Sequence, residues 1–147
     1  MKYFSQSDEE QVIADYFGDY VGTFLDIGAN DGVTFSNTRR LALNKWRGIA
    51  IEPNYYAYNR CHANSFCTRL FIFNLAITSQ NKVYELWCNN HHLTISDVGL
   101  LSTIKQQELS RWPNDSFIKR PVLGLTFKRF QNAYGVAQYD FISIDAE

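Results

Sequence analysis

The sequence has few cysteines, little net charge and no long apolar run. Its three cysteines stand at positions 61, 67 and 88, and they form no CxxC pair. An odd number without that spacing argues against a disulfide framework and a zinc site, so we expect free thiols in a reducing compartment and assign no metal ligand. The formal net charge of −1 implies no general attraction to nucleic acid or to an anionic membrane.

Targeting and membrane signals are also missing from the pattern. No apolar run approaches the roughly 20 residues that a membrane-spanning helix requires. The opening residues, MKYFSQSDEEQ, lack the apolar segment of a secretory signal peptide. The 147 residues contain no internal repeat and no low-complexity linker. We therefore expect one cytoplasmic domain spanning residues 1–147.

Short apolar segments alternate with amphipathic ones, and the 16% of aromatic residues favours a sheet-rich interior. By residue range, we predict strands at 23–27, 48–52, 70–77, 82–88 and 139–147, helices at 7–18, 34–45 and 55–65, a loop-rich segment at 89–120, and an extended piece leading into a helix at 122–135. The early alternation of strand and helix indicates right-handed crossovers and a mostly parallel sheet. The fold class is therefore α/β.

Acidic residues close three of the predicted strands. Asp26 ends the first strand, Glu52 ends the second, and Asp145 and Glu147 end the last. In a parallel sheet the carboxyl ends of the strands share one edge, and ligands bind beyond that edge. We therefore expect these side chains to surround a single ligand site, although each acid taken alone could simply be a solvated strand end.

The stretch FLDIGANDG, residues 24–32, has the composition of a ligand-binding turn. Its two glycines, Gly28 and Gly32, permit a tight turn and a close approach of the backbone to a ligand, and the following helix would offer free N–H groups. The turn lacks the middle glycine of the pyrophosphate-binding G-x-G-x-x-G pattern. Asp31 would repel a pyrophosphate but would suit a cationic ligand.

The spacing of the acids favours a nucleoside. Glu52 stands 26 positions after Asp26, near the roughly 20-residue spacing at which an acid binds ribose hydroxyls in dinucleotide-binding units. A carboxylate can accept two hydrogen bonds from a vicinal diol. Because S-adenosylmethionine combines a sulfonium, an amine and a ribose, we prefer this methyl donor to NAD.

Five segments, taken in order, resemble the FkbM family of S-adenosylmethionine-dependent methyltransferases. They are SQSDEEQ (5–11), FLDIGANDGVTFSNT (24–38), WRGIAIEPN (46–54), NLAI (74–77) and YDFISIDAE (139–147). The resemblance implies a Rossmann-like class I methyltransferase fold and methylation of oxygen on a sugar or a hydroxylated small molecule.

The resemblance also implies roles for individual residues. The turn from Gly28 through Ala29, Asn30 and Asp31 to Gly32, together with Asp26, would line the methionine part of the donor, with Ser36 and Asn37 just beyond. Glu52, followed by Pro53, would hold the ribose, and Asn74 and Ala76 would lie near the adenine. Asp145 and Glu147 would face the reacting methyl group or the acceptor, one of them as general base.

The family pattern continues beyond its last Glu with further strands. We therefore expect the chain to be the N-terminal, donor-binding part of a domain, truncated after the fourth core strand, with an exposed sheet edge that permits self-association. Three alternatives stay open: a non-catalytic donor-binding or partner-binding half-domain, a nicotinamide-dependent oxidoreductase, and RNA binding through scattered basic residues. His91 and His92 are further candidates for the site.

Overall fold

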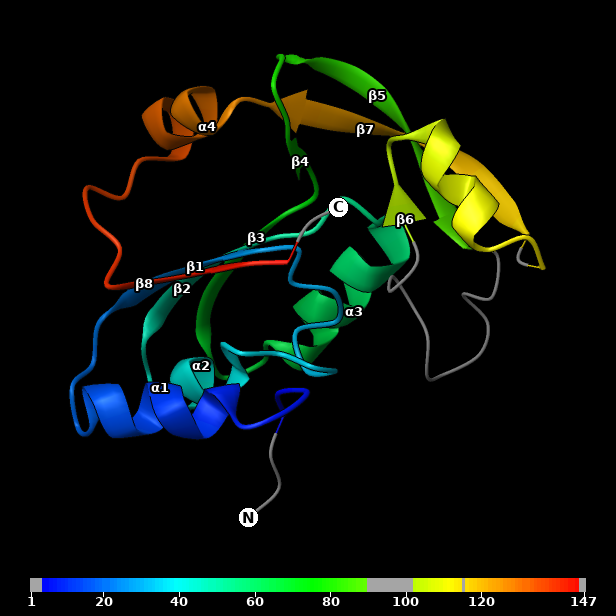
Figure 1. Ribbon diagram of the computed structural model, residues 1–147. Coiled ribbons are helices and arrows are strands. Elements are labelled where there is room, and N and C mark those ends of the chain that lie inside the picture. Colours follow the sequence, from blue (N-terminus) through cyan, green and yellow to red (C-terminus); the bar gives the residue numbers. More distant parts are fainter. Residues whose placement is uncertain (1–3, 90–101, 115, 146–147) are drawn as a thin grey trace.

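The computed structural model describes residues 4–89, 102–114 and 116–145. The first of its two sheets has the strand order β3-β2-β1-β8, and every neighbouring pair is parallel (Figure 1). Its strands are β1 (Thr23–Ile27), β2 (Arg47–Ile51), β3 (Arg69–Phe73) and β8 (Phe141–Ile144). The two central strands, β1 and β2, are almost continuously buried, as expected for strands of a parallel sheet covered on both faces.

Helices cover the two faces of this sheet unequally. They are α1 (Glu9–Phe17), α2 (Arg39–Leu43), α3 (Tyr55–Asn64) and α4 (Phe127–Tyr134). Phe24 packs with Trp46 on the face covered by α1, α2 and α3, whereas Leu25 and Ile49 pack against Phe130 of α4 on the other face. Figure 1 shows this division, with three helices on one side of the sheet and α4 on the other.

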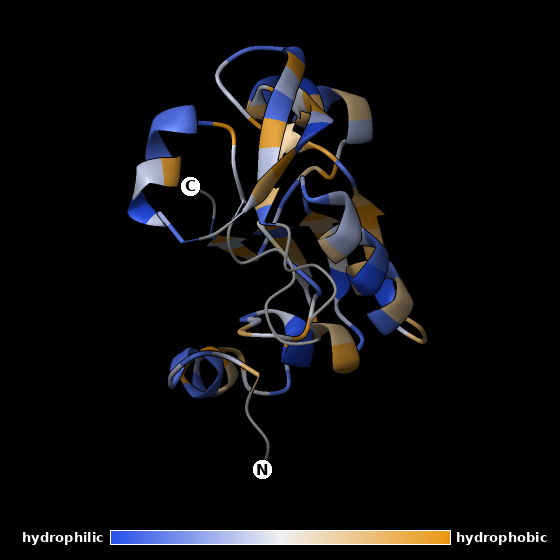
Figure 2. Cartoon of the chain, turned by 90° about the vertical axis from the view of Figure 1, so that its right-hand side faces the viewer, coloured by the Kyte–Doolittle hydropathy of each residue, from blue (hydrophilic) through white to orange (hydrophobic). Residues whose placement is uncertain are grey.

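A second, mixed sheet has the order β4-β7-β5-β6. Its strands are β4 (Ala76–Ile77), β5 (Lys82–Asn89), β6 (Ser102–Thr103) and β7 (Phe117–Leu125), and a 3-10 helix, η1 (Gln106–Arg111), follows β6. The long β5–β7 pair is antiparallel, and Figure 2 shows apolar and polar segments along it. Its inner residues Leu86 and Val122 form a core with Ala76.

The second sheet is attached to the beginning of α3 by polar contacts. The Asn54 side-chain nitrogen donates to Ser102 Oγ of β6 at 2.9 Å, and Arg120 of β7 donates to the Tyr56 hydroxyl at 2.8 Å. These contacts join it to the segment that follows β2.

The predicted mostly parallel sheet is confirmed, but three of the predicted elements are wrong in extent. The segment 70–77 is two strands in different sheets, because the chain turns at Asn74, whose side-chain nitrogen donates to the backbone oxygens of Glu52 and Pro53. The described part of 89–120 includes β6, η1 and the start of β7, so it is not simply loop.

The helix predicted at 34–45 contains only the five residues of α2. Phe35 has a positive φ of 55°, which ends helical geometry, and Ser36 Oγ accepts from the backbone N–H groups of Thr38 and Arg39. Side-chain oxygens that capture backbone N–H groups compete with helix formation in this way. The N–H groups of Thr38 and Arg39 at the start of α2 are therefore already occupied.

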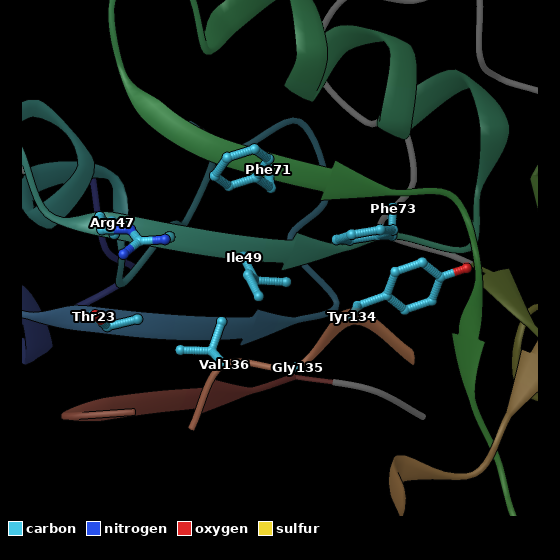
Figure 3. A pocket seen from close by; sticks show the side chains of 9 residues that line it. Thr23, Arg47, Ile49, Phe71, Phe73, Tyr134, Gly135 and Val136 are labelled. Carbon is cyan, nitrogen blue, oxygen red and sulfur yellow. The ribbon is translucent and has the colours of Figure 1, made fainter. Parts of the chain in front are cut away.

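A cavity of about 220 Å³ lies on the α4 face, near the amino ends of β1 and β2. Figure 3 shows Tyr134 and Val136 beside Ile49, with Phe71 and Phe73 of β3 along one side. The described residues that line this cavity include no carboxylate. It is therefore separate from the acidic residues at the carboxyl ends of the strands.

Candidate functional site

A hollow of about 390 Å³ opens at the carboxyl ends of β1 and β8, and its volume lies in the range of small-molecule sites. We call it the acidic hollow. Four separate segments line it: the N-terminal segment (Gln6, Glu9), the end of β1 with the following turn (Asp26, Gly28, Ala29, Asn30), the segment before α2 (Thr34, Phe35, Ser36, Asn37) and the end of β8 (Ser143, Ile144, Asp145).

About half of the site residues named from the sequence line this hollow. Those that do are Asp26, Gly28, Ala29, Asn30, Ser36, Asn37 and Asp145. Those that do not are Asp31, Gly32, Glu52, Pro53, Asn74 and Ala76. Glu147, His91 and His92 lie outside the described residues.

Sequence reasoning missed Gln6, Glu9, Thr34 and Phe35 as residues of the hollow. The segment SQSDEEQ was part of the family resemblance, but no chemical pattern within it indicated a place at the site. Helix α1 and the end of β8 are more than a hundred residues apart in the chain. A local sequence pattern therefore cannot show that the fold brings them together.

Three residues with positive φ build the turn at 28–32. The φ angles of Gly28, Asn30 and Gly32 are 86°, 50° and 71°. The N–H of Gly28 donates to the backbone oxygen of Ile51 at 2.8 Å, which fixes the turn to the end of β2. Because glycine adopts positive φ without steric cost, the two glycines of GANDG are explained by this turn geometry.

Glu52 lies directly beneath this turn, on the same edge of the sheet. Its Oε2 accepts from the N–H of Asn30 and its Oε1 accepts from the N–H of Asn54, both at 2.7 Å. The pKa of this carboxyl is raised to about 7: burial raises it most, the two N–H donors lower it, and the charges of Asp26 and Asp31 contribute to the rise. Glu52 therefore joins the ends of β1 and β2 through a carboxylate that titrates near neutral pH.

Asp26 is the most deeply placed carboxylate of the hollow. It is 5% exposed, and its Oδ2 accepts a hydrogen bond of 2.6 Å from the Thr38 hydroxyl. Burial raises the pKa of Asp26 to about 6, the Thr38 hydrogen bond opposes that rise, and the nearby charge of Asp145 adds to it. Asp145 itself is exposed, and its N–H donates to the backbone oxygen of Ile27, so the end of β8 is fixed beside β1.

Asp31 is committed to the turn. Its Oδ1 accepts from the N–H groups of Val33 and Thr34, at 2.9 and 2.7 Å, and its Oδ2 accepts from the Thr34 hydroxyl at 2.8 Å. This is a side chain organising its own loop, as Asp often does. A contact between this carboxylate and a ligand stays a prediction.

Asn74 and Ala76 stand where the chain passes from the first sheet to the second. Asn74 is exposed, and its side-chain nitrogen bonds the backbone oxygens of Glu52 and Pro53 at 2.9 and 3.0 Å. Ala76 is buried in the core of the second sheet. Asn74 therefore lies next to the segment after β2, and a contact between either residue and a nucleoside base stays a prediction.

The charge of the hollow indicates which ligands it suits. The charged residues among its described lining are Glu9, Asp26 and Asp145, all acidic. Asn30 adds a buried side-chain oxygen that has no hydrogen-bond partner in the described structure. Such a lining attracts ammonium and sulfonium groups and repels phosphates. The residues present therefore fit S-adenosylmethionine better than a pyrophosphate-bearing dinucleotide.

Two of the basic residues considered for RNA binding, Lys119 and Arg111, have local acidic partners. Lys119 pairs with Glu85 at 3.0 Å, and Arg111 pairs with Glu108 at 2.8 Å. In the part of the chain that the structure describes, no group of three or more His, Cys, Asp or Glu side chains could hold a metal ion. Likewise, no described helix has the length and apolarity to cross a membrane.

Comparison with known proteins agrees with the geometry of this edge. The family described as methyltransferase FkbM domain matches residues 26–147, which begin at Asp26 and include the acidic ends of β1, β2 and β8. Comparisons with curated proteins and with solved structures gave no match. Because the match covers most of the chain, this protein belongs to the FkbM methyltransferase domain family.

Proposed function

We propose that the chain binds S-adenosylmethionine in the acidic hollow and supports transfer of its methyl group to oxygen on a sugar or a hydroxylated small molecule. The observation that carries this proposal is the convergence of Asp26, residues 28–30 of the turn and Asp145 on one hollow with an entirely acidic set of described charges. The first sheet's order, β3-β2-β1-β8, agrees with the beginning of a Rossmann-like class I fold.

In this proposal each end of the donor has its own residues. The acceptors of the hollow, Asp26 and the free oxygen of Asn30, bind the ammonium end. Each oxygen of Glu52 accepts one N–H hydrogen bond, which leaves acceptor capacity for ribose hydroxyls. In this arrangement Asn74, which bonds the backbone oxygen of Glu52, and Ala76 would lie near the adenine, and Ser36 and Asn37, which line the hollow, would lie just beyond the methionine part.

The bound donor supplies an electrophilic methyl group on a positively charged sulfur. The protein's contribution is to align the acceptor hydroxyl with that methyl group and to accept the hydroxyl proton. Asp145 is an exposed carboxylate of the hollow that follows the carboxyl end of β8, so we propose it as the general base, with Glu147 as the second candidate.

Isothermal titration calorimetry tests the binding step directly. S-adenosylmethionine and S-adenosylhomocysteine should bind, whereas NAD should not, because its pyrophosphate would face Glu9, Asp26 and Asp145. Tight NAD binding without S-adenosylhomocysteine binding would instead support the oxidoreductase alternative.

Turnover is tested with a donor labelled in its methyl group and a panel of sugars and hydroxylated metabolites. Asp145→Asn should lower kcat by about 100-fold or more, while donor affinity changes little, because a general base acts only in the chemical step. Asp15→Asn, an exposed change on α1, is the matched control. Donor binding without methylation of any acceptor would favour the non-catalytic half-domain.

A further inference from the structure

Phe35 combines two unfavourable properties in one residue at the wall of the hollow. Its φ of 55° is a left-handed conformation that bulky side chains rarely adopt, and its side chain is 50% exposed. No aromatic ring of the described residues stacks on it, and it belongs to none of the hydrophobic clusters described above. Neither core packing nor backbone preference accounts for a phenylalanine here.

The backbone on both sides of Phe35 is fixed by hydrogen bonds. The N–H of Thr34 donates to Asp31 Oδ1 at 2.7 Å, and Ser36 Oγ accepts from the N–H of Arg39 at 3.0 Å. Ser36 is itself buried. A strained residue persists only where its surroundings determine its conformation, and such residues cluster at functional sites.

The chemistry around Phe35 selects a class of ligand group. Glu9, Asp26 and Asp145 line the same hollow, and its described lining includes no lysine or arginine. An aromatic face beside carboxylates is the arrangement that binds methylated onium cations, because the ring quadrupole attracts positive charge without a strong hydrogen bond. The buried oxygen of Asn30 offers the same hollow a further acceptor.

We propose that the Phe35 ring contacts the methyl-bearing sulfonium of the donor and thereby makes the hollow prefer the charged donor to its neutral product. This inference rests on the proposed function, and it assigns a specificity role to a residue that no sequence pattern indicated as a ligand contact. The ring interacts with the cation of S-adenosylmethionine, whereas the uncharged thioether of S-adenosylhomocysteine lacks that interaction.

The test measures both dissociation constants by calorimetry for the wild type and for Phe35→Leu. Leucine keeps an apolar side chain at the same positive φ but removes the aromatic ring. The ratio of the S-adenosylhomocysteine constant to the S-adenosylmethionine constant should fall about fivefold, as expected for loss of a cation–π contact. Phe66→Leu, at a position that is 86% exposed and outside the hollow, should leave the ratio unchanged.

A second variant, Phe35→Gly, separates ligand contact from structure. Glycine relieves the left-handed strain, so the midpoint of thermal unfolding without ligand should stay within about 3 °C of the wild type or rise, while the ratio of constants still falls. An unchanged ratio in both variants, with both ligands bound, overturns the role of Phe35 and leaves the proposed function intact. A wild-type chain that binds neither ligand overturns the proposed function itself.

Discussion

Glu52 is the residue whose chemistry depends most on its position. It is 5% exposed, and its pKa is raised from 4.5 to about 7, chiefly by burial. A carboxyl with a raised pKa binds its proton more tightly in the folded chain than in the unfolded chain. Its contribution to stability is therefore complete below about pH 4.5 and is lost as the pH rises through about 7.

We therefore expect the free energy of unfolding to fall, on the order of 3 kcal/mol from Glu52, as the pH rises from 4.5 to about 7. Glu52→Gln, which cannot ionise, should remove most of this decline, leaving the smaller share of Asp26. Urea unfolding at several pH values measures it, with exposed Asp8→Asn as control. If the free energy of unfolding of Glu52→Gln fell with pH as steeply as that of the wild type, the raised pKa would not belong to Glu52.

Ionisation of Glu52 should also change the affinity for the ligand with pH, in the direction opposite to its effect on stability. A ribose diol donates hydrogen bonds, so it needs the ionised form of Glu52 as acceptor. Affinity for S-adenosylhomocysteine should therefore increase as the pH rises through about 7, the pKa of Glu52 in the free chain. Calorimetry at pH values about one unit below and about one unit above that pKa measures this change in affinity. A pH-independent affinity would argue against a ribose contact.

The hydrogen bond from Thr38 to Asp26 gives a separate residue-scale prediction. Thr38→Val keeps the shape of the side chain but removes the 2.6 Å bond that lowers the pKa of Asp26. That pKa should rise, and the chain should lose roughly 2 kcal/mol of stability at neutral pH, as for other hydrogen bonds to a charged group. Carbon-13 NMR titration of the Asp26 carboxyl is the measurement, and a pKa that falls would refute the interpretation.

At the scale of elements, the turn at 28–32 and helix α3 fit against each other closely. A Cβ atom added to Gly32, whose φ is 71°, would stand 2.8 Å from the Sγ of Cys61 in α3. Gly32→Ala therefore combines backbone strain with a steric clash, and it should cost about 2 kcal/mol of stability.

A double-mutant cycle separates these two causes. Cys61→Ala removes the clashing sulfur, so the double variant Gly32→Ala/Cys61→Ala should lose less stability than the sum of the two single variants. The remaining cost is the backbone term at positive φ. Additive losses in chemical unfolding would mean that the turn does not pack on Cys61.

At the scale of the whole molecule, β8 is one of the two edge strands of the first sheet as the structure describes it, and β3 is the other. Strand β8 pairs with β1, and no other described strand pairs with it. Ile142 and Ile144 on this strand are 46% and 69% exposed. Unpaired backbone groups beside exposed apolar side chains favour pairing with another chain.

We therefore propose that the chain self-associates through β8. Sedimentation velocity should show oligomers that increase with concentration, and Ile142→Lys should reduce them because a charge at an edge strand disfavours pairing. Val12→Lys places the same charge on an exposed position of α1 and is the control. A wild-type chain that stays monomeric over the full concentration range contradicts the proposal.

The sequence by itself determined the parallel sheet and the edge at which the site forms. Apolar runs that end in Asp26, Glu52 and Asp145 indicate neighbouring parallel strands, and such strands must bring their carboxyl ends together. The turn glycines were equally readable, because positive φ restricts the residue type locally. Residues close together in the sequence determine these features, so they can be predicted from the sequence alone.

Only the tertiary structure decided which side chains line the hollow. In the fold the Asp31 carboxylate accepts hydrogen bonds from its own loop, and Glu52 lies beneath the turn. The fold also brings Glu9 and Phe35 to the walls of the acidic hollow. Side-chain hydrogen bonds compete with the backbone hydrogen bonds of regular structure, and contacts between distant segments depend on packing. No local pattern encodes either outcome, so the identity of the residues that line the hollow follows from the fold.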